Sequence, residues 1–229
     1  MNIIPWINLL PGLGLVGIVM IIHWKWSIGA GSILYASSRM IIQLILIGFV
    51  LNFIFNQSNP AWIALILLIM ISIASWIALR TIKEKRSQYL LWSLISIFIG
   101  GSLPLGVVIF LIIKPSTWYD PRVILPIAGM IYANGMNSVS LSADRYFVEI
   151  KHGATHIQAR AEALKTALIP ITNAFLAVGL VSLPGMMTGQ ILAGVSPLIA
   201  VRYQIMVMCM VFSASGLTAA IFLTSLKQK

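Results

Sequence analysis

Residues 61–79 read AWIALILLIMISIASWIAL and contain no charged side chain. A helix of about 20 apolar residues crosses the roughly 30 Å hydrocarbon core of a bilayer. Three further apolar segments without charges cover residues 6–22, 40–56 and 89–113. Because an α-helix satisfies its backbone hydrogen bonds within lipid, these four segments predict membrane-spanning helices.

Three less uniform segments complete the predicted membrane part. The fifth span begins near Val123 and ends before Asp144, the sixth begins near Ala167, and the seventh covers about residues 202–226. Pro104 and Pro184 lie inside predicted spans, where proline removes a helical hydrogen bond and predicts a kink or a break. The predicted fold is all-α: one transmembrane domain over residues 1–229, with about seven membrane helices.

The composition supports membrane burial. Of the 229 residues, 59% are hydrophobic and only 9% are charged, whereas soluble domains are roughly half apolar and a quarter charged. The net charge of +10 could suggest nucleic acid. The basic residues nevertheless punctuate apolar runs instead of forming a basic domain, so we expect a bilayer and no nucleic acid as partner.

The basic residues also predict an orientation. With seven spans, all but three of the 15 Lys and Arg residues fall on one side of the membrane, the exceptions being Lys114, Arg122 and Arg202. Cytoplasmic loops are enriched in Lys and Arg. The sequence therefore predicts a multi-pass protein of the plasma (inner) membrane, with its N-terminus outside and its C-terminus in the cytoplasm.

The acidic residues bear on the source of energy. All five lie in predicted loops or at span ends: Glu84, Asp120, Asp144, Glu149 and Glu162. Proton-coupled carriers use ionisable groups at membrane depth, so energy for uphill transport is expected to come from a cytoplasmic partner. The alternatives are a passive channel or facilitator and a membrane scaffold. The sequence has no GxxxxGK[ST] loop for ATP, so we expect no enzymatic activity and no cofactor bound by this chain.

The longest predicted cytoplasmic segment, residues 144–168, reads DRYFVEIKHGATHIQARAEALKTAL. Gly153 can end one helix in a left-handed conformation, and Thr155 with Gln158 forms a capping box that begins the next. The pattern predicts a helix, a tight turn and a second helix. Such a corner can dock on another protein, or it can be a solvated connection between two spans.

Polar and sulfur-bearing side chains inside spans are the candidates for a translocation path, since hydrocarbon offers polar groups no partner. Met130, Asn134, Asn137 and Leu141 share one helical face, which we expect to look into the bundle opposite the broken sixth span. No metal ligand is assigned. The predicted path comprises Gln43, Met130, Asn134, Met136, Asn137, Asn173, Pro184, Gly185, Met186 and Met187.

Several segments resemble one known family. RMIIQLILIGFVLNFIF (39–55), VILPIAGMIYANGMNSVSLSAD (123–144), HGATHIQA (152–159) and GLVSLPGMMTGQILAGVSPLIAVRYQIMVM (179–208) are similar to the FetB-type permeases, which include plant aluminium-tolerance permeases. The resemblance implies the permease of an ATP-binding-cassette (ABC) transporter. It implies two permease copies and two cytoplasmic ATPase subunits, with ATP and magnesium bound by the ATPase.

The resemblance also assigns roles and a cargo. The cytoplasmic corner looks like the coupling loop of ABC importers, which favours ATPase docking through Glu149, Gly153, Ala154, Thr155, Gln158 and Ala159. In bacteria the family is linked to iron export. Iron prefers carboxylate and imidazole ligands, whereas the predicted spans offer Asn, Ser, Gln and Met but no acid. The plant members are associated with nucleotide-sugar transport, so a chelated metal or a different solute is the alternative cargo.

Overall fold

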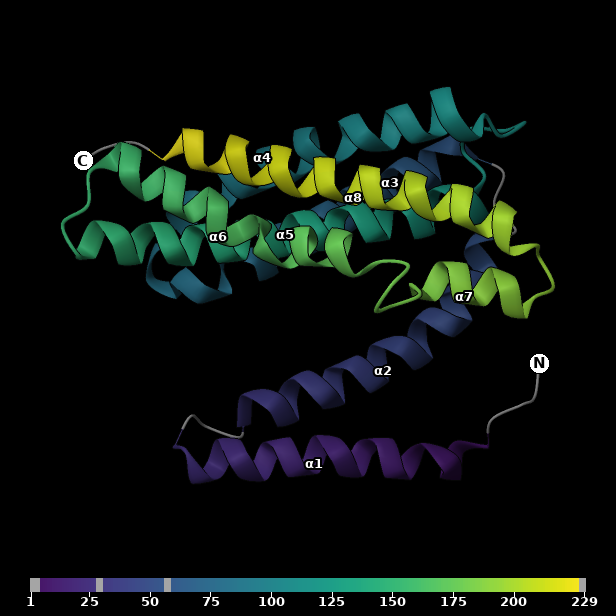
Figure 1. Ribbon diagram of the computed structural model, residues 1–229, viewed down its shortest axis with the longest axis horizontal. Helices are drawn as coiled ribbons and strands as arrows, with labels where there is room; N and C mark the ends of the chain where they lie inside the picture. Colours follow the sequence, from purple (N-terminus) through teal and green to yellow (C-terminus); the bar gives the residue numbers. More distant parts are fainter. Residues whose placement is uncertain (1–4, 28–30, 56–58, 227–229) are drawn as a thin grey trace. The chain divides into compact units, whose positions relative to one another are not determined.

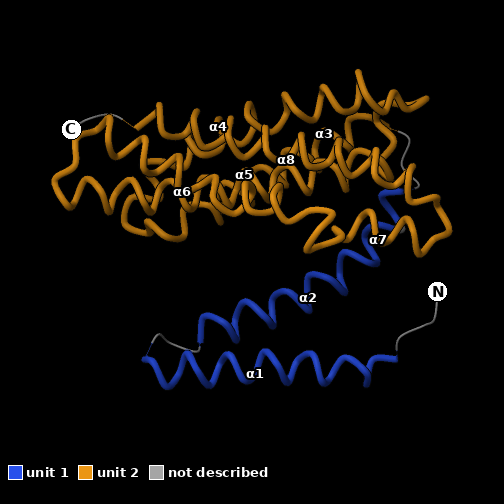
Figure 2. The backbone as a smooth tube through the Cα atoms, viewed as in Figure 1, with its two compact units in different colours: residues 1–57 blue, residues 58–229 orange. Residues whose placement is uncertain are grey.

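A computed structural model describes residues 5–27, 31–55 and 59–226. The chain divides into two compact units, residues 1–57 and residues 58–229 (Figure 2). The described residues form helices and contain no strand beyond one isolated bridge between Val178 and Ser182. The predicted all-α class is therefore confirmed.

The first unit holds two apolar helices. A 3-10 turn at Trp6–Leu9 leads into α1 (Leu10–Lys25), whose first turn carries a proline where no backbone donor is needed. The second helix, α2 (Gly31–Ile54), begins well before the predicted start at residue 40. The 3-10 turn with α1 (Trp6–Lys25) and the stretch Gly31–Leu51 of α2 are each long and apolar enough to cross a membrane.

The second unit is a helical bundle (Figure 1). Asn59 and Asp120 cap α3 (Pro60–Ala78) and α5 (Pro121–Lys151) by accepting hydrogen bonds from backbone N–H groups two residues later. In chain order the elements are α3 (Pro60–Ala78), a 3-10 segment η2 (Leu79–Lys85), α4 (Arg86–Val107), a π-helical segment η3 (Val108–Ile113), α5 (Pro121–Lys151), α6 (His156–Ala177), α7 (Gly185–Leu192) and α8 (Pro197–Ser225).

Small residues allow three helices of this unit to approach closely. A Cβ atom on Gly100 of α4 would lie 2.5 Å from Thr218 Oγ1 of α8, and one on Gly135 of α5 would lie 3.1 Å from the same oxygen. A fourth helix joins through a serine hydroxyl, since Ser93 of α4 donates to the Ser75 carbonyl of α3 at 3.3 Å. The core of the unit therefore lies along the α4–α5–α8 contact.

The two prolines predicted to disturb spans behave differently. Pro104 remains inside α4, and the chain changes to π-helical bonding only from Val108. The prediction of a sixth span interrupted at Pro184 is wrong in position, because α6 already ends at Ala177. Gly179 takes a left-handed φ of 83° in the loop that follows, and Pro184 is the residue before α7.

The structure supports several membrane crossings. Among the residues that the structure describes, four helical stretches are long and apolar enough to span a bilayer: Trp6–Lys25, Gly31–Leu51, Pro60–Ile113 and Pro197–Ser225. The third of these contains both α3 and α4, which are separated by the non-helical residue Ile82. The polytopic architecture is thus confirmed, whereas the count of seven spans is not, and the orientation of the termini stays a prediction.

Candidate functional site

The predicted cytoplasmic corner is a helix, a turn and a helix. At the end of α5, the Ala154 N–H donates to the Glu149 carbonyl and the Gly153 N–H donates to the Ile150 carbonyl, both at 3.1 Å. This pair of bonds is the Schellman arrangement, in which the residue after the cap is left-handed. Gly153 has a φ of 87°. Glycine adopts this conformation without the steric cost that a Cβ atom adds.

The second helix begins with the predicted capping box. The Thr155 N–H donates to Gln158 Oε1 at 3.1 Å, and the Gln158 N–H donates to Thr155 Oγ1 at 3.3 Å. Two N–H groups that a helix start leaves without partners are satisfied in this way. Ala159, one residue later, is fully buried. The local geometry of the corner is confirmed, while its role in docking stays a prediction.

Tertiary contacts that the sequence did not reveal hold the corner in place. Tyr146 of α5 and His156 of α6 share a hydrogen bond of 2.6 Å between the phenolic oxygen and Nδ1. Arg160 donates to the Thr224 carbonyl at 2.9 Å and to the Leu226 carbonyl at 3.1 Å. Since Thr224 belongs to α8, the corner is bonded directly to the end of the last helix. No local pattern signals a contact across more than 60 residues.

Ionisation of the Tyr146–His156 pair follows from its surroundings. Desolvation and then the nearby positive charge of Arg160 lower the pKa of His156. Burial raises the pKa of Tyr146, although Arg160 acts in the opposite direction. Both shifts favour the uncharged forms, so the bond joins a neutral phenol and a neutral imidazole at neutral pH.

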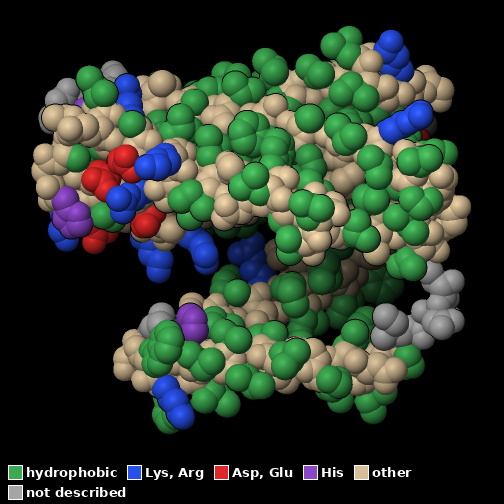
Figure 3. Space-filling view, in the orientation of Figure 1, with side chains coloured by type: hydrophobic (Ala, Val, Ile, Leu, Met, Phe, Trp, Pro, Cys, Tyr) green, Lys and Arg blue, Asp and Glu red, His purple; other side chains and the backbone are tan. Residues whose placement is uncertain are grey.

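The outward side of the corner combines apolar and charged groups. Ile157 is 79% exposed at the start of α6, and Lys151, His152 and Gln158 beside it are exposed too. Figure 3 shows charged side chains gathered at the end of the second unit where α5 meets α6, while hydrophobic side chains spread along its length. Protein interfaces combine an apolar centre with a polar rim, and Ile157 with its polar neighbours fits that arrangement on a small scale.

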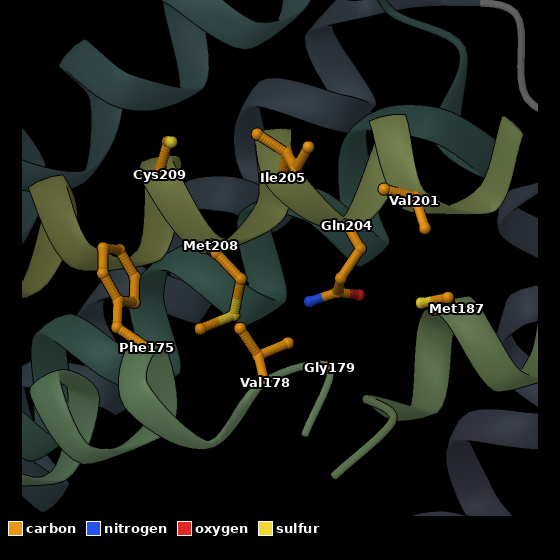
Figure 4. A pocket seen from close by; sticks show the side chains of 9 residues that line it. All are labelled: Phe175, Val178, Gly179, Met187, Val201, Gln204, Ile205, Met208 and Cys209. Carbon is orange, nitrogen blue, oxygen red and sulfur yellow. The ribbon is translucent and has the colours of Figure 1, made fainter. Parts of the chain in front are cut away.

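A pocket of about 370 Å³ lies where α6 breaks off. Phe175 at the end of α6, Val178 in the following loop and Met187 of α7 line it on one side. Gln204, Ile205 and Met208 of α8 line the other (Figure 4). Its volume is within the range of small-molecule sites, and its lining is almost wholly apolar.

Gln204 is the polar exception in this pocket. Its side chain points into the space between α8 and α7 (Figure 4) and is only 5% exposed. Its Oε1 atom has no hydrogen-bond partner, which is costly for a buried carbonyl oxygen. Gln204 is not among the predicted path residues, although a lone glutamine within an apolar helix is the same pattern that predicted Gln43.

The predicted path residues do not come together at one place in the second unit. Met187 lines the pocket, and Pro184, Gly185 and Met186 lie just before or at the start of the same short helix. Asn173, on α6, is exposed. Gln43 belongs to α2 in the first unit and is exposed there.

Within its unit the predicted inward face of α5 is only partly buried, and its place in a translocation path stays a prediction. Met130, Asn134 and Met136 are half-buried, whereas Asn137 and Leu141 are exposed. The Asn134 amide donates to the Met130 carbonyl of its own helix at 2.8 Å. The small residues Ala128, Gly135 and Ser142 occupy the buried side of α5 instead, because they allow closer packing.

The described residues contain no group of three or more His, Cys, Asp or Glu side chains that could hold a metal ion. The acidic residues lie at helix ends or in the corner: Asp120 caps α5, and Glu149 pairs with Arg145 one helical turn away. The pocket offers thioether sulfur from Met187 and Met208 and an amide oxygen from Gln204. This donor set is softer than the carboxylates that a bare iron ion prefers.

Comparison with known proteins gives one family over nearly the whole chain. The family described as "Uncharacterised protein family (UPF0014)" matches residues 6–229. A UPF0014 membrane protein of Synechocystis is 36% identical over 98% of this chain and 93% of its own length. Protein ALUMINUM SENSITIVE 3 of Arabidopsis thaliana is 37% identical, over 82% of this chain and 73% of its own length. "Probable iron export permease protein FetB" of Escherichia coli is 38% identical, over 82% and 77%. No solved structure matches the chain.

Proposed function

Because this chain belongs to the UPF0014 family of membrane proteins, we propose that it is the membrane-spanning permease subunit of an ABC transporter. A separate cytoplasmic ATPase supplies the energy, and two copies of each subunit form the complex. The transported cargo is a metal, with iron as the first candidate. The similarity to the E. coli protein named as a probable iron export permease supports this cargo.

The observation that carries the proposal is the anchored corner between α5 and α6. A tight turn at Gly153 and a capping box at Thr155 fix its backbone. Arg160 ties it to the end of α8. A partner that pushes on this corner therefore moves α8 directly, without first compressing a flexible loop.

The pocket between α7 and α8 is the proposed part of the path that this movement affects. Gln204 and Met208 belong to the same helix whose far end accepts the hydrogen bonds of Arg160. A rigid helix carries a displacement along its length. Cargo binding in the pocket and force on the corner thus both act on α8.

The apolar character of the pocket favours a cargo other than a bare iron ion. A chelated metal or another largely apolar solute would need no charged side chain in the pocket lining to balance its charge. A nucleotide sugar, by contrast, would bring phosphate charges to a place with no basic side chain in its lining.

Co-expression with the ATPase encoded in the same organism and reconstitution in liposomes test the function. We expect the two proteins to purify together and to hydrolyse ATP faster when iron or an iron chelate is supplied. Ile157→Asp should abolish co-purification, because it places a charge on the exposed apolar side chain of the corner. Lys151→Gln is the control, because Lys151 is also exposed at the corner but carries no apolar contact surface of this kind.

Two outcomes would contradict the proposal. An Ile157→Asp variant that binds the ATPase normally would remove the docking role of the corner. Flux of the cargo through liposomes that contain the permease alone, unchanged when the ATPase and ATP are added, would identify a passive facilitator.

A further inference from the structure

The turn between α3 and α4 forms a basic hollow outside the corner and the pocket. Residues 80–85 and Phe147 of α5 line a space of about 320 Å³, which we call the basic hollow. Ile82 has non-helical angles, φ −115° and ψ 52°, and separates α3 from α4. Arg80, Lys83 and Lys85 belong to its lining, and all three are exposed.

The positive charge in the basic hollow is not neutralised by ion pairs. Glu84 is the one acidic residue in its lining. Within residues 5–27, 31–55 and 59–226, the ion pairs join Arg145 to Glu149 and Lys165 to Glu162, and neither reaches the hollow. An anion that enters the hollow therefore meets three cations against one carboxylate, and neither of these two ion pairs engages those cations.

The hollow is held in shape against α5. Thr81 donates its hydroxyl hydrogen to the Ser140 carbonyl at 3.4 Å. The Lys85 ammonium lies 4.0 Å from the centre of the Phe147 ring, a cation–π distance, and Tyr89 packs on the same ring at 5.6 Å between centroids. The turn is consequently preorganised, so a ligand does not have to order it.

The position along the chain places the hollow at a membrane border. It directly follows α3, which is apolar throughout, and directly precedes α4. Trp76, in the last turn of α3, is 52% exposed, and Arg86 stacks over its ring with the guanidinium carbon 3.4 Å from the centroid. Exposed tryptophan is typical of the level where lipid headgroups lie.

We propose that the basic hollow binds the phosphate headgroup of an anionic phospholipid. Clusters of Lys and Arg next to a membrane helix attract anionic lipids, and lysine binds phosphate as a point charge. The volume of 320 Å³ is about ten times the roughly 30 Å³ share of a water molecule, which leaves room for a phosphate and part of its glycerol. The acyl chains would lie along the apolar exposed side of α3.

The site adjoins the corner but does not depend on the proposed transport function. Phe147 of the hollow packs on Tyr146 with centroids 5.2 Å apart, and Tyr146 bonds His156 at the start of α6. A headgroup bound in the hollow therefore contacts the Phe147 ring. The preceding residue in the chain, Tyr146, holds the corner through its hydrogen bond to His156. Lipid binding can be measured on the permease alone.

Native mass spectrometry of the full-length chain in a neutral detergent tests the proposal. Phosphatidylglycerol and phosphatidylcholine with identical acyl chains are titrated separately. We expect phosphatidylglycerol to bind more tightly, and the Lys83→Gln/Lys85→Gln variant to lose roughly tenfold or more of that affinity, since each basic residue at a membrane surface contributes several-fold. Lys151→Gln/Lys165→Gln removes the same charge elsewhere and should retain the affinity.

Further arms separate the possible sources of phosphate. Inorganic phosphate at the same concentration should neither bind measurably nor displace the lipid, because it lacks the acyl chains that lie on α3. Equal loss of affinity in both double variants would overturn the proposal in favour of a diffuse charge effect, and displacement by inorganic phosphate would overturn it in favour of a free anion. Thermal unfolding of each variant without lipid checks folding, and Lys83→Gln alone, at an exposed position, should give an intermediate loss if a double variant unfolds.

Discussion

At the scale of single residues, burial of Gln204 lowers the stability of the folded protein but provides a polar group for a bound cargo. Its carbonyl oxygen is buried without a partner in an otherwise apolar pocket. Such a group costs about 1–3 kcal/mol of folding free energy. A bound cargo that donates a hydrogen bond would remove this cost.

Replacement of Gln204 by leucine should therefore keep or raise the thermal unfolding midpoint of the permease in detergent. The same variant should lose cargo-stimulated ATP hydrolysis in the reconstituted complex, because the one polar group of the pocket is gone. Ile205→Val, a change of similar position without loss of a polar group, is the control. A lowered midpoint with normal stimulation would remove Gln204 from the cargo site.

His156 predicts a pH dependence at the same scale. Its lowered pKa means that the folded corner resists protonation more than the unfolded chain does. The stability it contributes is present above the ordinary histidine pKa of about 6.5 and is lost as pH falls through the lower, folded-state pKa. We expect the unfolding midpoint to drop between pH 7 and pH 5 more steeply in the wild type than in His156→Gln. Parallel curves for the two proteins would exclude a role for this imidazole.

At the scale of elements, the turn between α5 and α6 depends on one left-handed residue. A residue with a Cβ atom in this conformation costs roughly 1–2 kcal/mol, while asparagine tolerates it better. No atom lies within 4 Å of the position of a Cβ on Gly153, so only backbone strain opposes substitution.

Gly153→Val should lower the unfolding midpoint and reduce ATPase coupling, and Gly153→Asn should be affected less on both counts. Thermal unfolding of the permease and ATP hydrolysis by the reconstituted complex provide the two measurements. Equal behaviour of the valine and asparagine variants would show that the left-handed conformation is not what the corner requires.

The bond between α6 and α8 is the second feature at the element scale. Arg160 brings a positive guanidinium to carbonyls at the C-terminal end of α8, where a helix end favours positive charge. Hydrogen bonds to a charged group contribute about 1.5–3 kcal/mol, and the half-buried position of Arg160 places the effect at the lower end.

Arg160→Ala should cost about 1.5 kcal/mol of stability and should lower the ATP hydrolysis that the cargo stimulates more than basal hydrolysis. Arg160→Lys keeps the charge but can reach only one of the two carbonyls well, so an intermediate effect is expected. If alanine at position 160 lowers stability but leaves cargo stimulation unchanged, the bond is structural and does not transmit force.

At the scale of the whole molecule, the second unit depends on close approach of α4, α5 and α8. The Thr218 side chain lies against Gly100 and Gly135 from the two other helices. Lipid gives little hydrophobic drive for helix association, so packing of small residues takes a larger share. This contact point sets the spacing of the bundle.

Gly100→Ala should destabilise the bundle by about 1–3 kcal/mol, because the new Cβ atom would overlap backbone as well as side-chain atoms of Thr218. Gly106→Ala in the same helix is the matched control, since no atom lies within 4 Å of a Cβ there. Alanine also favours helix over glycine by up to about 1 kcal/mol. The two variants should thus shift the unfolding midpoint in opposite directions, and shifts of the same sign would contradict the packing.

The sequence alone determined the features that depend on local chemistry. Hydropathy predicted the membrane helices, and the residues from Gly153 to Gln158 predicted the corner with its left-handed cap and capping box. Both depend on interactions within a few residues. Proline was a poorer guide, because the end of α6 at Ala177 follows from the loop conformation around Gly179 and not from Pro184 itself.

Only the tertiary structure decided which side of α5 is buried, that Gln204 points into a pocket, and that Arg160 bonds the end of α8. Each of these depends on partners far away in the sequence, and a helix with polar groups on one side and small residues on another can bury either side. Packing of Gly135 against Thr218 selects the small-residue side, since backbones approach closest where side chains are short.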